Sequence, residues 1–243
     1  MPKTCLIIPC YNEADRLDIL PFENFLSAAK NFSICFADDG STDDTRNVLH
    51  SFQSKFPGRV FLVTQDINRG KAEIVRAGVN AMYALSEFDY LGYFDADLSS
   101  PLSEAFSLVN FLDSHSNCQV VFGSRISKTG AVIRKNYLRH FAGRLFSSMV
   151  NYYFNISLYD TQCGAKIFRK EIAPLAFDEA FLSRWLCDIE IILRLRKSFD
   201  DGDAFVSEYP LKTWINKKGS KIKLADLLKL PGELISIKKK YNH

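Results

Sequence analysis

The sequence lacks the long apolar runs that mark membrane-spanning and exported proteins. No stretch approaches the roughly 18 to 20 apolar residues of a membrane-spanning helix. The amino-terminal segment also lacks the basic region followed by a long apolar region that forms a signal peptide. We therefore expect a chain that is neither exported by a signal peptide nor threaded through a bilayer.

Cysteine pairing motifs are absent as well. The six cysteines contain no C-x-x-C pair, and most of them lie in apolar runs. A free thiol in such a run packs as a small hydrophobic group, so the cysteines indicate neither a disulfide framework nor a zinc site. A reducing cytoplasm is the simplest location for this protein.

Two common nucleotide-binding motifs and a strong charge excess are also missing. Neither G-x-G-x-x-G nor G-x-x-x-x-G-K-[ST] occurs, which disfavours a hydride-transferring dinucleotide enzyme and a P-loop enzyme. The net charge is only +3, so the whole molecule has no electrostatic footprint for nucleic acid. We expect no nucleic-acid partner.

What the sequence does have is a regular alternation of β-rich runs and helical periods. At 243 residues, 47% of them hydrophobic, the chain is long enough for one large domain. Near-continuous apolar strands alternating with helices predict an α/β fold, a mostly parallel sheet covered by helices on both faces. The expected strands are 4–9, 33–38, 60–65, 90–97 and 118–124, and the expected helices are 17–30, 42–56, 71–85 and 101–114.

Polar motifs follow the first four expected strands. They read IIPCYNE, ADDGSTDDT, QDINRGK and DADLSS, in chain order. In open parallel sheets, ligands bind outside the carboxyl ends of the strands. The sequence therefore predicts one binding site at this edge.

The DADLSS motif brings two carboxylates to the end of the fourth strand. Strand side chains alternate, so Asp95 and Asp97 are expected on the same side of the chain. Mg²⁺ or Mn²⁺ prefers oxygen ligands and commonly bridges carboxylates to substrate phosphates. The alternative is a loop of exposed acids that caps the helix beginning at Pro101.

The ADDGSTDDT motif has two readings. Asp, Gly, Ser and Thr are ordinary turn and N-cap residues, so the motif can be structural. Asp38 and Asp39 nevertheless precede the cap, where a carboxylate can accept a hydrogen bond from a nucleobase N–H or a ribose hydroxyl.

The run from Asn68 to Gly78 places two cationic side chains near the start of an expected helix. Gly70 and Lys71 lie at the expected helix start, and Arg76 follows about a turn and a half later. Helix amino termini attract phosphate, and both cations would strengthen that attraction. A solvated basic surface is the alternative.

Together, eight motifs resemble family 2 glycosyltransferases of the GT-A fold, in particular the polyprenyl-phosphate sugar synthases of the dolichyl-phosphate glucosyltransferase type. The similarity extends to about Lys221. The motifs are PCYNE (9–13), DDGSTD (38–43), NRGKAEIVRAG (68–78), DAD (95–97), GSR (123–125), DTQCGAKIF (160–168), RWLCDIE (184–190) and WINKKGSK (214–221).

This resemblance implies a role for each matching residue. The nucleotide-binding set is Pro9, Tyr11, Glu13, Asp38, Asp39, Ser41, Gly70, Lys71, Arg76 and Asp95. Asp97, assisted by Asp95, would hold Mg²⁺ or Mn²⁺ on the diphosphate. The expected catalytic set is Asp97, Arg125, Arg139, Asp160 and Asp188, and the expected sugar and acceptor contacts are Arg125, Arg139, Gln162 and Lys221.

The expected acceptor, a lipid phosphate, needs little help from a general base. Its second pKa lies near ~6, so its oxygens are already anionic at neutral pH. The arginines would position it for in-line attack with inversion at the anomeric carbon. For Asp160, Gln162, Asp188 and Glu190 the open alternatives are sugar recognition, base catalysis and internal salt bridges with Arg184 and Arg194.

The segment from Ile133 to Phe154 and the tail are basic and apolar. We divide the chain into a glycosyltransferase domain, 1–215, and a basic carboxyl-terminal tail, 216–243, in which Pro231 should break the helical period. Both segments suit a membrane surface with anionic headgroups, although aromatics and leucines at helical spacing also fit a packed core. Attachment would be peripheral, at the cytoplasmic face, or made through a separate membrane protein.

The expected activity is transfer of a hexose, with UDP-glucose as the favoured donor, to a polyprenyl or dolichyl phosphate. A close rival uses GDP-mannose, and another transfers to a glycan or other hydroxyl, which requires a base. A third alternative is a nucleotide-sugar binding or scaffold protein without turnover. A fourth is a nucleotidyltransferase, which would release pyrophosphate.

Overall fold

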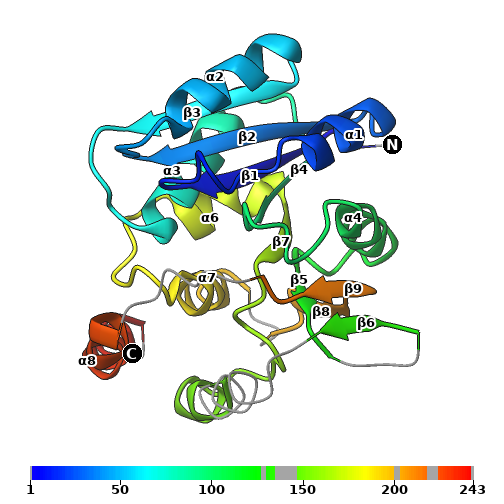
Figure 1. Cartoon of the computed structure of the whole chain (residues 1–243). Helices are drawn as coiled ribbons and strands as arrows, with labels where there is room; N and C mark the ends of the chain where they lie inside the picture. Colours follow the sequence, from blue (N-terminus) through cyan, green and yellow to red (C-terminus); the bar gives the residue numbers. More distant parts are fainter. Residues whose placement is uncertain (1, 127–129, 135–146, 200–202, 218–223, 242–243) are drawn as a thin grey trace.

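The fold is built on a seven-stranded sheet in the order β3-β2-β1-β4-β7-β5-β8. A computed structural model describes residues 2–126, 130–134, 147–199, 203–217 and 224–241 (Figure 1). The strands are β1 Thr4–Cys10, β2 Phe32–Asp39, β3 Val60–Gln65, β4 Tyr90–Phe94, β5 Val120–Ser124, β7 Ala165–Arg169 and β8 Val206–Pro210.

The expected mostly parallel sheet is confirmed. Strand β1 pairs in parallel with both β2 and β4, and β2 pairs in parallel with β3. Strand β7 is the exception, because it lies antiparallel between β4 and β5. The carboxyl ends of β1, β2 and β4 therefore meet at one edge, and the segment that enters β7 starts from the same edge.

Helices cover both faces of the sheet (Figure 1). Alternate residues of β1 enter two separate cores: Ile7 belongs to the core that includes residues of α3, α6 and α7, whereas Ile8 belongs to the core that includes residues of α1, α2 and α4. The helices are α1 Leu20–Ala28, α2 Thr45–Lys55, α3 Lys71–Ala84, α4 Glu104–Ser114, α6 Ala173–Phe177 and α7 Cys187–Arg196, with a short 3₁₀ turn, η1, at Lys170–Ile172.

The fourth strand is shorter than the sequence indicated. Strand β4 ends at Phe94, and Asp95 begins a turn in which Leu98 N–H donates to Asp95 C=O over 3.0 Å. Leu98 has a φ of 51°, a left-handed conformation that a strand does not adopt. Strand alternation is therefore the wrong reason for the placement of Asp95 and Asp97, since the turn positions both side chains.

A second, two-stranded sheet lies beside the DADLSS turn. It pairs β6, Val132–Arg134, with β9, Thr213–Ile215. The backbone N–H of Ile215 donates to Ser99 C=O over 2.9 Å. This bond brings the start of the WINKKGSK segment next to the DADLSS motif, a contact that the order of the two motifs in the sequence could not show.

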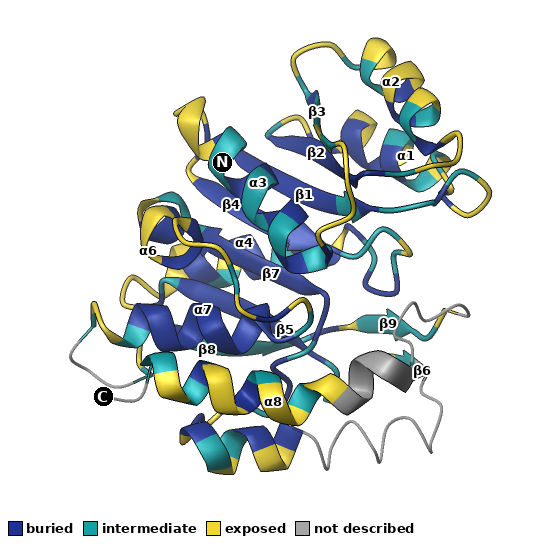
Figure 2. Ribbon diagram, turned by 90° about the vertical axis from the view of Figure 1, so that its left-hand side faces the viewer, coloured by how far each residue is buried: buried dark blue, intermediate teal, exposed yellow. Residues whose placement is uncertain are grey.

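The carboxyl-terminal helix α8, Leu224–Tyr241, packs on α7 (Figure 2). Leu234 and Ile237 are buried in the main core, and Arg194 of α7 donates to the Tyr241 hydroxyl over 2.9 Å. Pro231 lies inside the helix, so the expected break at this residue is wrong. In the part of the chain that the structure describes, no helix has the length and apolarity needed to cross a membrane.

Candidate active site at the carboxyl edge of the sheet

The loops after β1 and β2 are joined to each other at the predicted edge. Asn12 N–H donates to Ser41 Oγ over 2.9 Å, and Asn12 Oδ1 accepts from Thr42 N–H over 2.8 Å. Glu13 N–H donates to Thr45 Oγ1 over 2.7 Å, at the start of α2. The PCYNE and DDGSTD motifs therefore form one structural unit. Of the expected nucleotide contacts in it, Pro9, Tyr11 and Ser41 are half-buried and Glu13 is buried.

The two adjacent aspartates of this unit have different surroundings. Asp38 is fully buried, and its carboxylate accepts hydrogen bonds from Ser41 and Arg46. These bonds hold the turn after β2, and the nucleotide contact expected of Asp38 stays a prediction. Asp39 accepts the backbone N–H groups of Arg69 and Gly70, both over 2.8 Å. Burial raises the pKa of Asp39, and these two N–H donors oppose that shift.

Gly70 joins this unit to the start of α3. Its φ of 102° favours glycine, and a Cβ at this position would lie 2.5 Å from Arg184 Nε. Lys71, the first residue of α3, contacts the carboxylate of Asp95. Desolvation lowers the pKa of Lys71, but Asp95 and then Asp188 outweigh it and raise that pKa above its usual value.

Arg76 contacts groups other than those of the edge. Its Nε lies 3.1 Å from Glu73 Oε2, and its Nη1 donates to the backbone C=O of Asp178 over 2.9 Å. The first contact lies within α3, and the second ties α3 to the residue that follows α6. Arg76 therefore packs the start of α3 against the segment after α6, and the phosphate contact expected of it stays a prediction.

The DADLSS turn holds its two carboxylates differently. Asp95 N–H donates to Gly164 C=O over 3.0 Å, and a Cβ on Gly164 would lie 1.8 Å from Asp95 Oδ2. The Asp95 side chain is thus packed directly on the backbone of the DTQCGAKIF segment. Asp97 is exposed, and its Oδ1 accepts from Ser99 N–H over 2.8 Å.

These carboxylates fit a hard divalent cation that substrate phosphates help to bind. Among the described residues, no three His, Cys, Asp or Glu side chains form a cluster suited to a metal ion. Mg²⁺ commonly uses only one or two carboxylates and takes its other ligands from water and phosphate. Asp95 and Asp97 supply oxygen ligands of that kind at an accessible edge.

Arg125 and Asp160 form the second charged part of the site. Arg125 Nε and Nη2 donate to the two Asp160 oxygens over 2.6 and 2.7 Å, and the guanidinium lies over the Trp214 ring at 5.3 Å. Glu208 of β8 accepts the backbone N–H groups of Tyr159 and Asp160. Desolvation would raise the pKa of Asp160, but its hydrogen bonds to Arg125 overcome this and lower it.

Among the residues that the structure describes, three buried polar atoms near this pair have no hydrogen-bond partner. They are the Ser124 hydroxyl, the Thr161 hydroxyl and the amide nitrogen of Gln162. Gln162 is the one that sequence analysis assigned to sugar or acceptor binding. Its unpaired Nε2 leaves a donor for such a contact.

Asp188 is internal. Its Oδ1 accepts from the Tyr93 hydroxyl, and its Oδ2 lies 3.2 Å from Lys166 Nζ. Of the alternatives left open by the sequence, the internal salt bridge is therefore the observed one, with Lys166 rather than an arginine as partner. Glu190 is also internal, since it accepts the N–H groups of Leu182 and Ser183.

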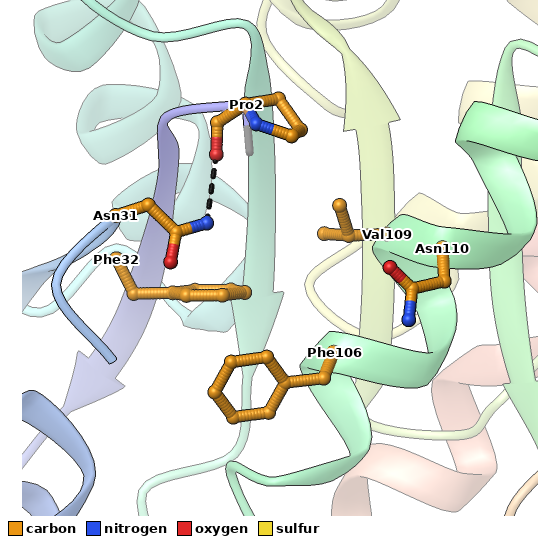
Figure 3. Close-up of a pocket in the computed structure, with 6 residues that line it drawn as sticks. All are labelled: Pro2, Asn31, Phe32, Phe106, Val109 and Asn110. Atoms are coloured by element: carbon orange, nitrogen blue, oxygen red, sulfur yellow. Dashed lines mark hydrogen bonds between the residues drawn. The ribbon is translucent and has the colours of Figure 1, made fainter. Parts of the chain in front are cut away.

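In the part of the chain that the structure describes, a small depression and a much larger, open one lie at opposite ends of the sheet. One is lined by Pro2, Asn31, Phe32, Phe106, Val109 and Asn110, and Asn31 donates to Pro2 C=O over 2.9 Å (Figure 3). It lies at the amino ends of β1 and β2, away from the candidate site. The other is open, lies at the carboxyl end of β3, and is lined by Gln65, Asp66, Ile67 and Arg69.

Sequence analysis assigned no role to four supporting residues, although three of them lie in its motifs: Lys166, Gly164, Glu208 and Trp214. A lone lysine inside the apolar strand AKIFR was the one available signal, because a charge in a buried strand needs a partner. Arg139 and Lys221 lie outside the described residues.

Solved structures with the same architecture confirm the GT-A fold. Mannosyl-3-phosphoglycerate synthase from Rubrobacter xylanophilus superposes with a TM-score of 0.70 at 15% identity, covering 98% of this chain and 73% of that one. Glucosyl-3-phosphoglycerate synthase from Mycobacterium tuberculosis, crystallised with Mn²⁺, UDP and glucosyl-3-phosphoglycerate, superposes with a TM-score of 0.66 at 15% identity, covering 99% of this chain and 80% of that one.

Sequence comparisons identify the family. A dolichyl-phosphate beta-glucosyltransferase of Trichomonas vaginalis is 29% identical over 96% of this chain and 72% of its own. The corresponding enzyme of Saccharomyces cerevisiae is 29% identical over 97% of this chain and 74% of its own. Residues 5–174 match the family described as glycosyl transferase family 2. Fold, motifs and sequence therefore agree that the chain belongs to glycosyltransferase family 2.

Proposed function

We propose that this chain is a metal-dependent, inverting glucosyltransferase that moves glucose from UDP-glucose to a polyprenyl or dolichyl phosphate. The observation that carries the proposal is that three charged residues lie at one edge of the sheet. They are Asp39, which is buried and accepts two backbone N–H groups, Asp97, which is exposed, and Arg125, which is paired with Asp160. The similarity to dolichyl-phosphate glucosyltransferases over nearly the whole chain supports the choice of sugar and acceptor.

On the donor side, the joined loops after β1 and β2 would hold the nucleoside. The open depression at the end of β3 borders Arg69, whose N–H is bound by Asp39, so it offers room for a base or ribose beside that carboxylate. Lys71, at the positive end of α3, would then attract the diphosphate.

Asp95 and Asp97 are the proposed ligands of Mg²⁺ or Mn²⁺. When bound, the cation would offset the negative charge that develops on the departing diphosphate. Gly164 packs against the Asp95 carboxylate and fixes its position, whereas the Asp97 side chain is exposed, so a cation can reach it from solvent.

On the acceptor side, Arg125 is the described residue that can bind a phosphate. A guanidinium has five N–H donors, and Asp160 accepts two of them, so donors remain for phosphate oxygens. Trp214 and Asp160 fix the plane of this group, which orients the bound acceptor for in-line attack. Arg139 and Lys221 are proposed to complete this site on the strength of the sequence motifs.

We also propose peripheral contact with the cytoplasmic face of a membrane, directly or through a separate membrane protein. In the helical residues 147–154, Met149 is 49% and Tyr152 is 92% exposed. Lys238 of α8 lies 3.9 Å from the centre of the neighbouring Tyr153 ring, and exposed apolar groups beside such a lysine suit a surface of anionic headgroups. The carboxyl-terminal tail, 216–243, is proposed to share in this contact.

The test is product identification with a matrix of donors and acceptors. UDP-glucose and GDP-mannose are each incubated with a short polyprenyl phosphate, the corresponding polyprenol and a soluble glycan. We expect glucosyl-phosphoryl-polyprenol of the β configuration from UDP-glucose and the lipid phosphate alone. Transfer from GDP-mannose, transfer to a hydroxyl acceptor, or release of pyrophosphate would each replace the proposal with the corresponding rival.

A further inference from the structure

A fully buried lysine lies at the centre of the protein, below the proposed metal-binding turn. Lys166 of β7 has no exposed surface, and its ammonium lies 4.6 Å from the centre of the Phe122 ring and 5.2 Å from that of Tyr93. A buried charge is costly unless it is paired and hydrogen-bonded. Lys166 has both kinds of partner, since Asp188 Oδ2 lies at 3.2 Å and Cys163 C=O accepts a hydrogen bond.

Both oxygens of Asp188 are already in use. One accepts from the Tyr93 hydroxyl and the other faces Lys166, while the residue as a whole is 6% exposed. A general base must come within hydrogen-bond reach of the proton that it removes. Asp188 would have to leave both partners and the core to do so.

Lys166, Asp188 and Tyr93 form a cluster that is connected to Asp95 through two segments of the chain. Tyr93 precedes Asp95 by two residues at the end of β4. Lys166 binds the carbonyl of Cys163, and the next residue, Gly164, accepts the Asp95 N–H and packs against its carboxylate. Two segments therefore support Asp95: the end of β4, through Tyr93, and the Gly164 backbone, through Lys166. Displacing any member of the cluster shifts one of these two segments.

We infer that Lys166, Asp188 and Tyr93 are positioning residues that hold Asp95 at the edge of the sheet, and that Asp188 acts as a buried counter-ion and takes no proton from the acceptor. This inference rests on the proposed function, in which the acceptor is a phosphate. Such an acceptor is already anionic at neutral pH and needs no base. A hydroxyl acceptor would need one.

The experiment compares Lys166→Met, Asp188→Asn and the double variant in thermal unfolding, Mn²⁺ affinity in the presence of UDP, and kcat. Each single variant leaves one buried charge unpaired, so we expect loss of stability and weaker Mn²⁺ binding. The double variant removes both charges at similar volume and should recover Mn²⁺ affinity and kcat to within about threefold to tenfold of wild type, the remaining loss coming from the missing hydrogen bond to Cys163 C=O.

A role of Asp188 as a base would give a different result. If the double variant folds and binds Mn²⁺ and UDP as wild type does, but its kcat falls by about 10² to 10⁴, then Asp188 is a base and the inference is overturned. These binding measurements do not depend on the acceptor, so they separate this result from a failure of the proposed function. The latter would appear as wild-type protein that binds Mn²⁺ and UDP without transferring to a lipid phosphate.

Tyr93→Phe tests the same inference in a variant with a conserved core volume. It removes only the hydroxyl that binds Asp188. We expect Mn²⁺ affinity in the presence of UDP to fall several-fold while kcat at saturating metal changes by less than about twofold. A lower melting temperature with unchanged Mn²⁺ affinity would show that the cluster stabilises the fold alone, and would overturn its positioning role.

Discussion

Replacing Gly164 by alanine should displace the proposed metal-binding Asp95 without removing any charged group. A Cβ at residue 164 would lie 1.8 Å from Asp95 Oδ2 and 2.3 Å from Asp95 Cγ. Nonbonded heavy atoms pack favourably at about 3.5 to 4.0 Å, so the carboxylate has to move by more than about 1 Å. The Asp95 backbone cannot follow freely, because its N–H is bound to Gly164 C=O.

A shift of that size is large for a catalytic group. Misplacement by about 1 Å can reduce a rate by about 100-fold, which corresponds to about 2.7 kcal/mol of transition-state stabilisation. We therefore expect Gly164→Ala to lower kcat/KM for UDP-glucose by about two orders of magnitude and to raise the Mn²⁺ concentration needed for half-maximal activity.

The assay is a Mn²⁺ titration of transfer at fixed UDP-glucose and acceptor, with thermal unfolding measured in parallel. Gly232→Ala in α8 is the matched control, because no atom lies within 4 Å of the Cβ it would add. It should leave the titration unchanged. A folded Gly164→Ala protein with wild-type metal dependence and kcat/KM would refute the assignment of Asp95 to the metal site.

Three further perturbations address other parts of the site. Gly70→Ala places a Cβ 2.5 Å from Arg184 Nε at a φ of 102°, so it should lower stability by about 1 to 3 kcal/mol in thermal unfolding and weaken UDP binding measured by calorimetry. Lys71→Met removes the cation beside Asp95, and calorimetry should show UDP affinity reduced by about tenfold or more, because a hydrogen bond to a charged group contributes about 1.5 to 3 kcal/mol. On folding, desolvation raises the pKa of Asp160, but Arg125 lowers it by more, so the net shift is downward. The Asp160–Arg125 pair therefore contributes its full stability above about pH 4, the pKa of an unfolded aspartate, and loses it as the pH falls through the folded-state pKa of Asp160. Denaturant unfolding between about pH 5 and 2 should therefore show a steeper loss in wild type than in Asp160→Asn.

The succession of strands and helices was predictable because local patterns determine it. The predicted strand 60–65 matches β3, and the predicted helix 71–85 matches α3 to within one residue. Alternating apolar runs and turn residues are sufficient for such elements. The edge where the motifs meet was also predictable, since parallel strands end on the same side.

What the sequence could not predict depends on contacts between distant segments. Asp188 was an open choice among three roles, and only the fold brings Lys166 of β7 and Tyr93 of β4 to its two oxygens. The same holds for Gly164, which looks like an ordinary turn glycine until Asp95 is placed on it. Pro231 misled the analysis for a related reason: a helix that gains its stability from packing can tolerate a proline.

The measurement that tests the central claim most directly is UDP release from UDP-glucose by the wild-type chain, with and without a short polyprenyl phosphate, in Mn²⁺ or in excess chelator. Asp97→Ala and Arg125→Ala are assayed beside it. We predict release that requires both the lipid phosphate and the metal, and that falls by at least about 100-fold in each variant. Release that is independent of the lipid, or unaffected by both substitutions, would contradict the proposed metal and acceptor sites together.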